Sequence, residues 1–178
     1  MSLKLELDEV YPQEGEQTEL EELKPMADGI SGMLGLRLGK YLLDYADAQV
    51  LGWVFGADTD FELPGVGKRR PNVAFCTYAT LPEVPRTVIP VPPDLVVEIT
   101  SSWDEIDLTD KKVKEYRRVG IKLVWVVKPE GEVVEVYRNG KPSDLLGIGD
   151  ELDGDPLLPG FRLPLSKLFE TRKPPIKL

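Results

Sequence analysis

The sequence contains no histidine among its 178 residues and only one cysteine, Cys76. The missing histidine excludes Ser-His and Cys-His catalytic centres, histidine-ligated zinc and acid–base catalysis by histidine. A single cysteine excludes an internal disulfide and fits a reducing, cytoplasmic compartment. Because Cys76 continues the apolar pattern of Val73 and Phe75, we expect it in the core. Any catalysis must use carboxylates, lysines, hydroxyls or a hard metal ion bound through oxygen.

Long hydrophobic runs are also missing. No stretch approaches the ~18 consecutive apolar residues of a membrane span, and the acidic N-terminus lacks the apolar segment of a signal peptide. The formal net charge of -9 argues against tight non-specific binding to nucleic acid. Basic residues nevertheless gather at 68–70 and 111–122. They either form a local basic cleft, if both groups lie on one rim, or are solvated faces of a loop and a helix.

The pattern that is present predicts an α/β fold in which one mixed β-sheet is flanked by helices. Apolar residues recur at helical spacing in 27–45, and 104–119 reads as a second helix that ends at Gly120. Strands are expected at 48–55, 60–63, 70–76, 95–99, 123–127 and 132–137, with weak edge strands over 145–152 and 161–163. We expect an N-terminal arm with a short helix in 1–26, one domain in 27–170 and a C-terminal tail in 171–178.

One carboxylate stands out because it interrupts an apolar strand. Glu98 lies within the run 95–99, whose apolar side chains on both faces predict a strand covered on both sides. A buried charge without a partner costs several kcal/mol, so Glu98 needs a cation or a donor. At about 100° per residue, Lys112 of the following helix points the same way as Leu108, Tyr116 and Val119, which we expect to face inward. An inward lysine facing a strand carboxylate is typical of metal-dependent phosphodiesterases and equally of a buried ion pair.

Several stretches together are similar to a known family. The segments RRPNVAF, VPPDLVVEITSS, GIKLVWVVKPEGEVVEVYRNG and LPGFRLPLSKLF, with the run from Asp107 to Tyr116, resemble the Uma-type restriction endonucleases. That family belongs to the PD-(D/E)XK nuclease superfamily. The resemblance implies a restriction-endonuclease-like core and Mg²⁺- or Mn²⁺-dependent cleavage of DNA phosphodiesters. It covers about residues 27–170.

The resemblance assigns site residues by position. The glutamate of the (D/E)XK element falls on Glu98, and its lysine position holds Thr100. The lysine of this family resembles one supplied from the following helix, which matches Lys112. Asp107 and Tyr116 match further recurrent positions and are accessory candidates.

The sequence departs from the family pattern at the aspartate of the PD element, where it has Asn72. An amide oxygen can still ligate a cation, so Glu98 and Asn72 are the expected metal ligands, but one negative charge is lost. The family's additional acid in the first long helix is also not found. Asp58, Asp60, Asp104 and Asp107 are candidates to replace it.

Two functions therefore remain open at this point. The first is a metal-dependent endonuclease weakened by Asn72. The second is an inactive nuclease-fold protein that binds nucleic acid or another protein. Candidate nucleic-acid contacts are Trp103, which can stack on bases, and the cluster Lys68, Arg69 and Arg70. The alternating strand 132–137 and the Pro-rich loop 78–93 can support a homodimer.

Overall fold

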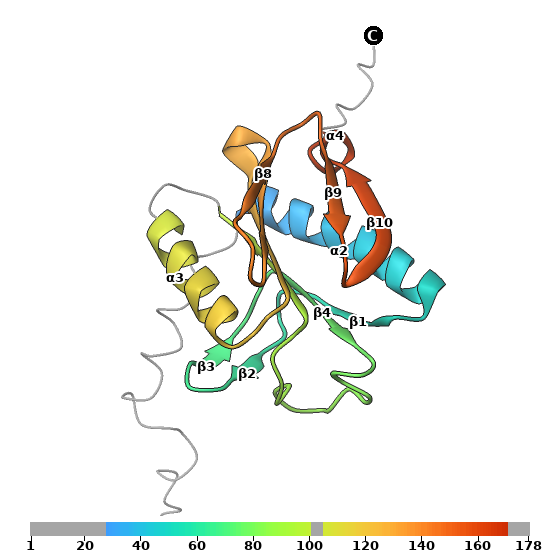
Figure 1. Cartoon of the computed structure of the whole chain (residues 1–178), viewed down its shortest axis with the longest axis vertical. Coiled ribbons are helices and arrows are strands. Elements are labelled where there is room, and N and C mark those ends of the chain that lie inside the picture. Colours follow the sequence, from blue (N-terminus) through green and yellow to red (C-terminus); the bar gives the residue numbers. More distant parts are fainter. Residues whose placement is uncertain (1–27, 101–104, 171–178) are drawn as a thin grey trace, which may run out of the picture.

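The computed structural model describes residues 28–100 and 105–170. Its centre is a six-stranded sheet in the order β1-β4-β5-β6-β7-β8 (Figure 1). The strands are β1 (Gly52–Phe55), β4 (Val73–Thr77), β5 (Leu95–Ile99), β6 (Leu123–Lys128), β7 (Val133–Arg138) and β8 (Asp144–Leu146). Strands β5 and β6 run parallel and the other neighbours run antiparallel, so the sheet is mixed as predicted.

Helices and two small ribbons complete the described fold. The helices are α2 (Gly29–Gln49), α3 (Glu105–Arg118), α4 (Leu165–Leu168) and the 3₁₀ turn η1 (Pro129–Gly131). The ribbons pair β2 (Phe61–Leu63) with β3 (Gly67–Arg69), and β9 (Glu151–Gly154) with β10 (Leu158–Pro164). None of the helices in this part of the chain is both long and apolar enough to cross a membrane.

The central strand β5 is covered on both faces, as its apolar pattern predicted. All five of its residues are buried. Val97 packs in a core with α2, α4 and the β9–β10 ribbon, whereas Val96 packs in a second core with α3 and β2. Cys76 lies in this second core, where burial raises the pKa of its thiol to about 12. Since side chains alternate along a strand, Glu98 faces the same side as Val96, towards α3.

Two glycines of helix α2, Gly35 and Gly39, face the sheet at ordinary packing distance and leave room for a methyl group. A Cβ at Gly35 would lie 3.5 Å from Ile99 Cδ1, and one at Gly39 would lie 3.8 Å from a methyl of Val73. The carboxylate of Asp28 caps the helix by accepting the Ser31 backbone N–H. The helix continues to Gln49, so β1 begins at Gly52 rather than at residue 48 as predicted.

Helix α3 is the crossover that a parallel β5–β6 pair requires. It ends at Arg118, and Gly120 takes the positive φ of 84° that a helix C-terminus favours. The prediction that Leu108 faces inward is wrong, because its side chain is 52% exposed. The buried face consists of Thr109, Val113 and Tyr116. Lys112 lies at the edge of that face.

Strand β3 was not predicted. The chain turns after β2 and returns over Gly67–Arg69 to pair with it, in a stretch where no strand was expected between 60–63 and 70–76. Glycine and charged residues have low strand propensity, so the pairing is set by the neighbouring strand rather than by local preference.

Candidate active site

Glu98 is a carboxylate enclosed between the sheet and α3. The residue is only 4% exposed. Its Oε1 accepts a hydrogen bond from Tyr116 Oη at 2.5 Å, and its Oε2 accepts one from Lys112 Nζ at 3.1 Å. A buried carboxylate is stable only when its charge is matched and its oxygens are bonded. Both requirements are met here by side chains of one helix.

Lys112 and Tyr116 reach Glu98 together because they lie one helical turn apart on α3. Residues at i and i+4 lie on one side of a helix, so two donors can approach the two oxygens of one carboxylate. The Lys112 side chain remains 25% exposed, whereas Tyr116 is buried. Burial, followed by the negative charge of Glu98, raises the pKa of the Tyr116 phenol well above its ordinary value. Tyr116 is therefore a hydrogen-bond donor at neutral pH.

Asn72 lies on the neighbouring strand, next to Glu98. Val73 pairs with Val97 across β4 and β5, which puts Asn72 opposite Glu98 just before β4 begins. Its backbone N–H donates to the Val97 carbonyl, and its Oδ1 accepts the Ile99 backbone N–H at 3.0 Å. The amide oxygen thus extends the antiparallel pairing by one hydrogen bond. This bond gives Asn72 a role in the sheet that is independent of any metal.

The other expected site residues are more scattered. Thr100 is buried, and both its backbone N–H and its hydroxyl donate to the Val127 carbonyl, which holds the strand end in place. The side chain of Asp107 lies outside the described residues, as do Trp103 and Asp104. Asp58 is exposed. Of the site residues that the resemblance assigns, the structure brings together Glu98, Lys112 and Tyr116. Asn72 lies beside them.

The basic cluster 68–70 is largely neutralised. Arg69 donates through Nε and Nη2 to Glu115 of α3 at 2.9 and 2.7 Å, and this pair is mostly buried. Arg70 makes an ion pair of 2.6 Å with Asp60. Lys68 is exposed. Of the three basic residues predicted to contact nucleic acid, two are therefore already bonded to carboxylates.

The oxygen atoms of Glu98 and Asn72 can be compared with the ligands that a divalent ion needs. Mg²⁺ prefers hard oxygen ligands and keeps several waters. Each Glu98 oxygen makes one hydrogen bond and retains a further lone pair, as does Asn72 Oδ1. These oxygens are of the type that a divalent ion accepts as ligands, but they carry one negative charge instead of two, with an ammonium group beside it. Within the described part of the chain, no three His, Cys, Asp or Glu side chains form a metal-binding group.

Sequence reasoning missed two polar clusters, both of which brace the sheet. Asp94, buried just before β5, accepts from Lys122 Nζ at 2.7 Å and from the Thr77 backbone N–H at 2.7 Å. The only sequence signal was an acid directly before a buried strand. The second cluster is centred on Arg138 at the end of β7.

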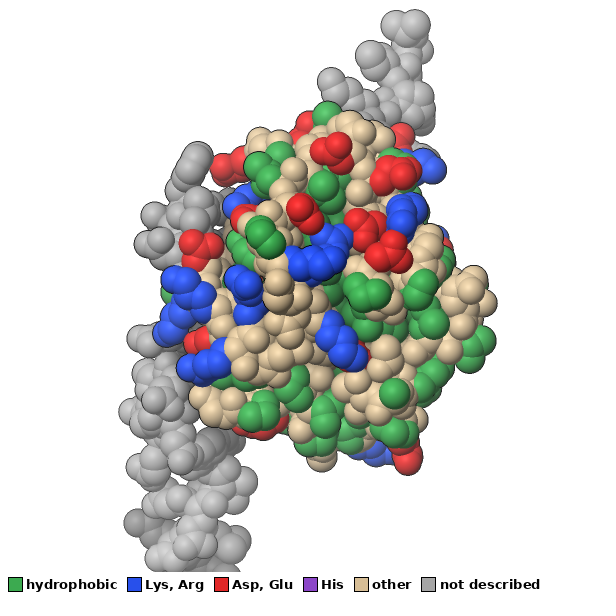
Figure 2. Space-filling view, in the orientation of Figure 1, with side chains coloured by type: hydrophobic (Ala, Val, Ile, Leu, Met, Phe, Trp, Pro, Cys, Tyr) green, Lys and Arg blue, Asp and Glu red, His purple; other side chains and the backbone are tan. Residues whose placement is uncertain are grey.

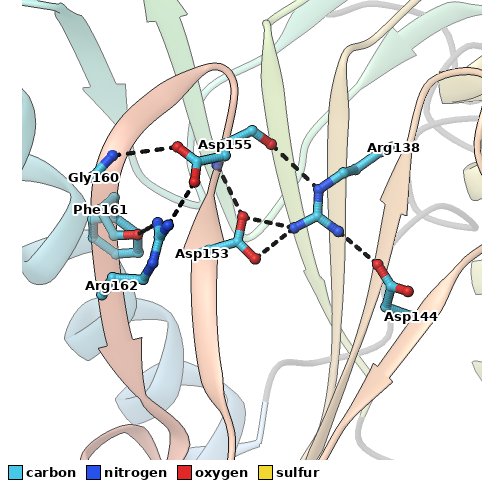
Figure 3. A network of polar contacts seen from close by, with 7 residues as sticks. All are labelled: Arg138, Asp144, Asp153, Asp155, Gly160, Phe161 and Arg162. Carbon is cyan, nitrogen blue, oxygen red and sulfur yellow. Dashed lines mark hydrogen bonds and ion pairs between the residues drawn. The ribbon is translucent and has the colours of Figure 1, made fainter.

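Figure 3 shows Arg138 between Asp153 and Asp144, with Arg162 bound to Asp155 nearby. These contacts link β7 to β8 and to the β9–β10 ribbon. A groove of about 420 Å³ adjoins the cluster and is lined in part by Arg138 and Asp155. Since each arginine is matched by a carboxylate, the cluster is best explained as a structural brace.

Comparisons with known proteins give a family and a fold. A protein-family model described as "Uma2: Putative restriction endonuclease" matches residues 11–166. A crystal structure described as a "putative nuclease belonging to DUF820", from Anabaena variabilis, is similar with a TM-score of 0.74. Its sequence is 16% identical, and the match covers 82% of this chain and 83% of that one, which supports the fold. A search of curated proteins gives no match.

Proposed function

Because the chain belongs to the Uma2 family of "putative restriction endonucleases", we propose that it is a metal-dependent DNA endonuclease of reduced metal affinity. Glu98, Lys112 and Asn72 are its proposed active-site residues, and Tyr116 is a positioning residue. The main support is the 3.1 Å contact between Lys112 Nζ and Glu98 Oε2. A carboxylate and an amine meet there in a place shielded from most of the solvent.

Each proposed residue has a distinct physical task. The Glu98 carboxylate and the Asn72 amide oxygen would hold a Mg²⁺ or Mn²⁺ ion. When bound, such an ion polarises the phosphate and lowers the pKa of an attacking water. The Lys112 ammonium can orient that water or stabilise negative charge that develops on the phosphate. Tyr116 fixes the Glu98 carboxylate through the 2.5 Å hydrogen bond, so the ligand does not rotate.

Asn72 is the reason for proposing reduced metal affinity. An amide carries no net charge, so Glu98 alone provides the negative charge, and Lys112 offsets it. A divalent ion must therefore compete with an ammonium that is already bonded to the same carboxylate. We expect binding in the millimolar range and a preference for Mn²⁺, which loses its water ligands more readily than Mg²⁺ does.

The second candidate function is an inactive nuclease-fold protein that binds nucleic acid or another protein. One observation favours it: the oxygens of Glu98 and Asn72 all have hydrogen-bond donors without any metal. The group is complete as a structural ion pair. Metal binding separates this candidate from the first.

The experiment is calorimetric titration with Mn²⁺ and Mg²⁺, paired with a plasmid-nicking assay. The wild type, Glu98→Gln and Glu115→Gln are compared. Glu115 is a suitable control because it lies on α3 but pairs with Arg69 instead of facing Asn72. A saturable site and nicking that are lost in Glu98→Gln and kept in Glu115→Gln support the endonuclease. If no saturable binding is seen at millimolar metal, the endonuclease proposal fails, and the second candidate, an inactive protein that binds nucleic acid or another protein, is favoured.

A further inference from the structure

The outer face of α3 carries a concentration of positive charge. Lys111, Lys114, Arg117 and Arg118 are all exposed. At 100° per residue they fall within one arc of about 120°, which begins beside the buried Val113 and extends to the side of the helix away from Thr109 and Tyr116. Asp110 is the one acid in that arc among the helix residues whose side chains are described. In Figure 2, Lys and Arg side chains gather over α3.

These four cations differ from the paired arginines of the fold because none has a carboxylate partner in the described part of the chain. None of them makes an ion pair with a side chain in residues 28–100 or 108–170. Arg69, Arg70, Arg138 and Arg162 all have carboxylate partners. The face is therefore electropositive in a chain whose net charge is -9.

Folding explains only part of this arrangement, because Arg117 and Arg118 lie in the last turn of α3, where cations are favoured, whereas Lys111 and Lys114 do not. Like charges three or four residues apart on a helix destabilise it by about 0.2–0.5 kcal/mol per pair. Lys111 and Lys114 form such a pair, and Lys114 forms further pairs with Arg117 and Arg118. The helix retains repulsion at Lys111 and Lys114 that a neutral side chain there would relieve. An external anion would supply the negative charge that this face of α3 lacks.

The surroundings keep this face rigid. Arg118 Nη2 donates to the Gly65 carbonyl at 3.3 Å, and the Arg69–Glu115 pair joins β3 to α3. The β2–β3 ribbon is therefore fixed beside the helix. The backbone positions that carry the cations are thus fixed before an anion binds, which lowers the ordering cost of binding.

The dimensions fit a nucleic-acid backbone. From Lys111 to Arg118 a helix rises about 10 Å, at 1.5 Å per residue. Each strand of duplex DNA carries one phosphate per about 3.4 Å along its axis, so this length spans about three phosphates of a strand. We propose that the outer face of α3 is the surface that holds the backbone phosphates of duplex DNA. This inference rests on the proposed function, since it names how the substrate of that function is held.

One helix then does both tasks. Its outer cations hold the duplex, and its inner Lys112 and Tyr116 organise Glu98. Because the two sets are on the same rigid element, a duplex held along α3 keeps a fixed position relative to Glu98. The contacts are with phosphates, so they give affinity and salt dependence but no sequence preference.

The test compares two triple variants with the same net charge. Lys111→Gln, Lys114→Gln and Arg117→Gln together remove the α3 cations while leaving the Arg118–Gly65 contact intact. The control combines Lys40→Gln, Arg86→Gln and Lys167→Gln, which are exposed cations of α2, the Pro-rich loop and α4. Binding of a short DNA duplex is measured in metal-free buffer as a function of KCl concentration.

We expect the α3 variant to weaken binding and to reduce the slope of log Kd against log salt by about 2 to 3. The control should keep the wild-type slope. Equal slopes for the two variants, or tighter binding of duplex RNA than of DNA, would overturn the inference. Thermal unfolding must show that the α3 variant folds, and relief of repulsion should leave its Tm at or above that of the wild type.

The same assay separates this inference from the proposed function. Glu98→Gln removes the proposed metal ligand without touching the outer face, so it should bind duplex with wild-type affinity. Suppose that neither wild type nor Glu98→Gln nicks DNA but the α3 variant loses binding. The DNA-binding surface is then supported and the endonuclease proposal is wrong. Suppose instead that the wild type nicks DNA and the α3 variant binds like the control. The endonuclease proposal is then supported and the DNA-binding surface on α3 is wrong.

Discussion

Tyr116 donates a hydrogen bond of 2.5 Å to Glu98, and both side chains are buried between α3 and the sheet. The bond joins two residues 18 positions apart and links the crossover helix to the central strand. A hydrogen bond to a charged acceptor in a dry site is stronger than one between neutral groups. The contact therefore matters for stability as well as for the orientation of Glu98.

We predict that Tyr116→Phe lowers the free energy of unfolding by about 1.5–3 kcal/mol, the range for a hydrogen bond to a charged group. The benzene ring keeps its packing in the core, so the change isolates the hydroxyl. Urea unfolding followed by tryptophan fluorescence measures it. Tyr78→Phe is the control because Tyr78 lies at the surface, and we expect a change within about 0.5 kcal/mol there.

The same pair predicts a response to alkaline pH. The pKa of Tyr116 is raised by burial and by Glu98 from its ordinary value of 10.0, so the folded protein keeps the phenol protonated where the unfolded chain ionises. The resulting stability is complete below pH 10.0 and is lost as the pH rises through the folded pKa. The difference in stability between wild type and Tyr116→Phe should shift in that sense between neutral pH and pH above 10.0. A difference that is constant across this range would contradict it.

The Lys112–Glu98 pair predicts energetic coupling. Lys112→Met leaves the Glu98 carboxylate without its counter-charge and should cost about 1–3 kcal/mol. In a double-mutant cycle with Glu98→Gln, the second change should then cost less than it does alone, with a coupling of about 0.5–3 kcal/mol. Lys114→Met, on the exposed side of the same helix, should change stability by less than about 0.5 kcal/mol. Additive effects of the two substitutions would mean that the contact contributes nothing.

Much of this site can be predicted from the sequence because it depends on local periodicity. The strand 95–99 follows from its apolar run, and the position of Lys112 follows from 100° per residue. Leu108 was assigned to the wrong side because that same arithmetic places it, with Lys112, at the edge of the buried arc. Thr109 and Val113 define the centre of the arc. Helical periodicity predicts the direction of each side chain but not how wide the buried face of the helix is.

The contacts that could not be predicted join segments far apart in the chain. Arg69 reaches Glu115 across 46 positions, and Asn72 accepts the Ile99 N–H across 27. Both depend on the strand register and on how the β2–β3 ribbon packs, which no local pattern encodes. Strand β3 was missed for the same reason. The homodimer and the stacking role of Trp103 remain predictions, and Trp103 lies outside the described residues.

The buried Asp94 predicts sensitivity to acid. Burial raises the pKa of its carboxyl, but hydrogen bonds from Lys122, Thr77 and Thr80 outweigh that effect and lower the pKa below its ordinary 3.8. The stability from this group is therefore present above pH 3.8 and is lost as the pH falls through the folded pKa. We expect Asp94→Asn to cost about 1.5–3 kcal/mol at neutral pH, with a smaller difference from wild type in acid. Urea unfolding at neutral and acidic pH measures both.

The last prediction concerns the amide that replaces an acid. In Asn72→Asp, an Asp oxygen can still accept the Ile99 N–H, so the sheet should form normally. The added carboxylate lies opposite Glu98, and without metal the two like charges repel each other, which should lower Tm. Millimolar Mn²⁺ should restore the Tm, because a ligand that binds only the folded state stabilises it by mass action. The wild type should show a smaller rise at the same metal concentration.

Asn139→Asp is the matched control for this experiment, since it adds the same charge at an exposed turn. It should show no metal-dependent rise in Tm beyond that of the wild type. Asn72→Asp should also nick plasmid DNA faster than the wild type, and this gain should disappear in the double variant with Glu98→Gln. A metal response equal in Asn72→Asp and Asn139→Asp would show that Glu98 and residue 72 do not hold the ion together. Asn72 would then be needed only for the hydrogen bond that it makes to the backbone of β5.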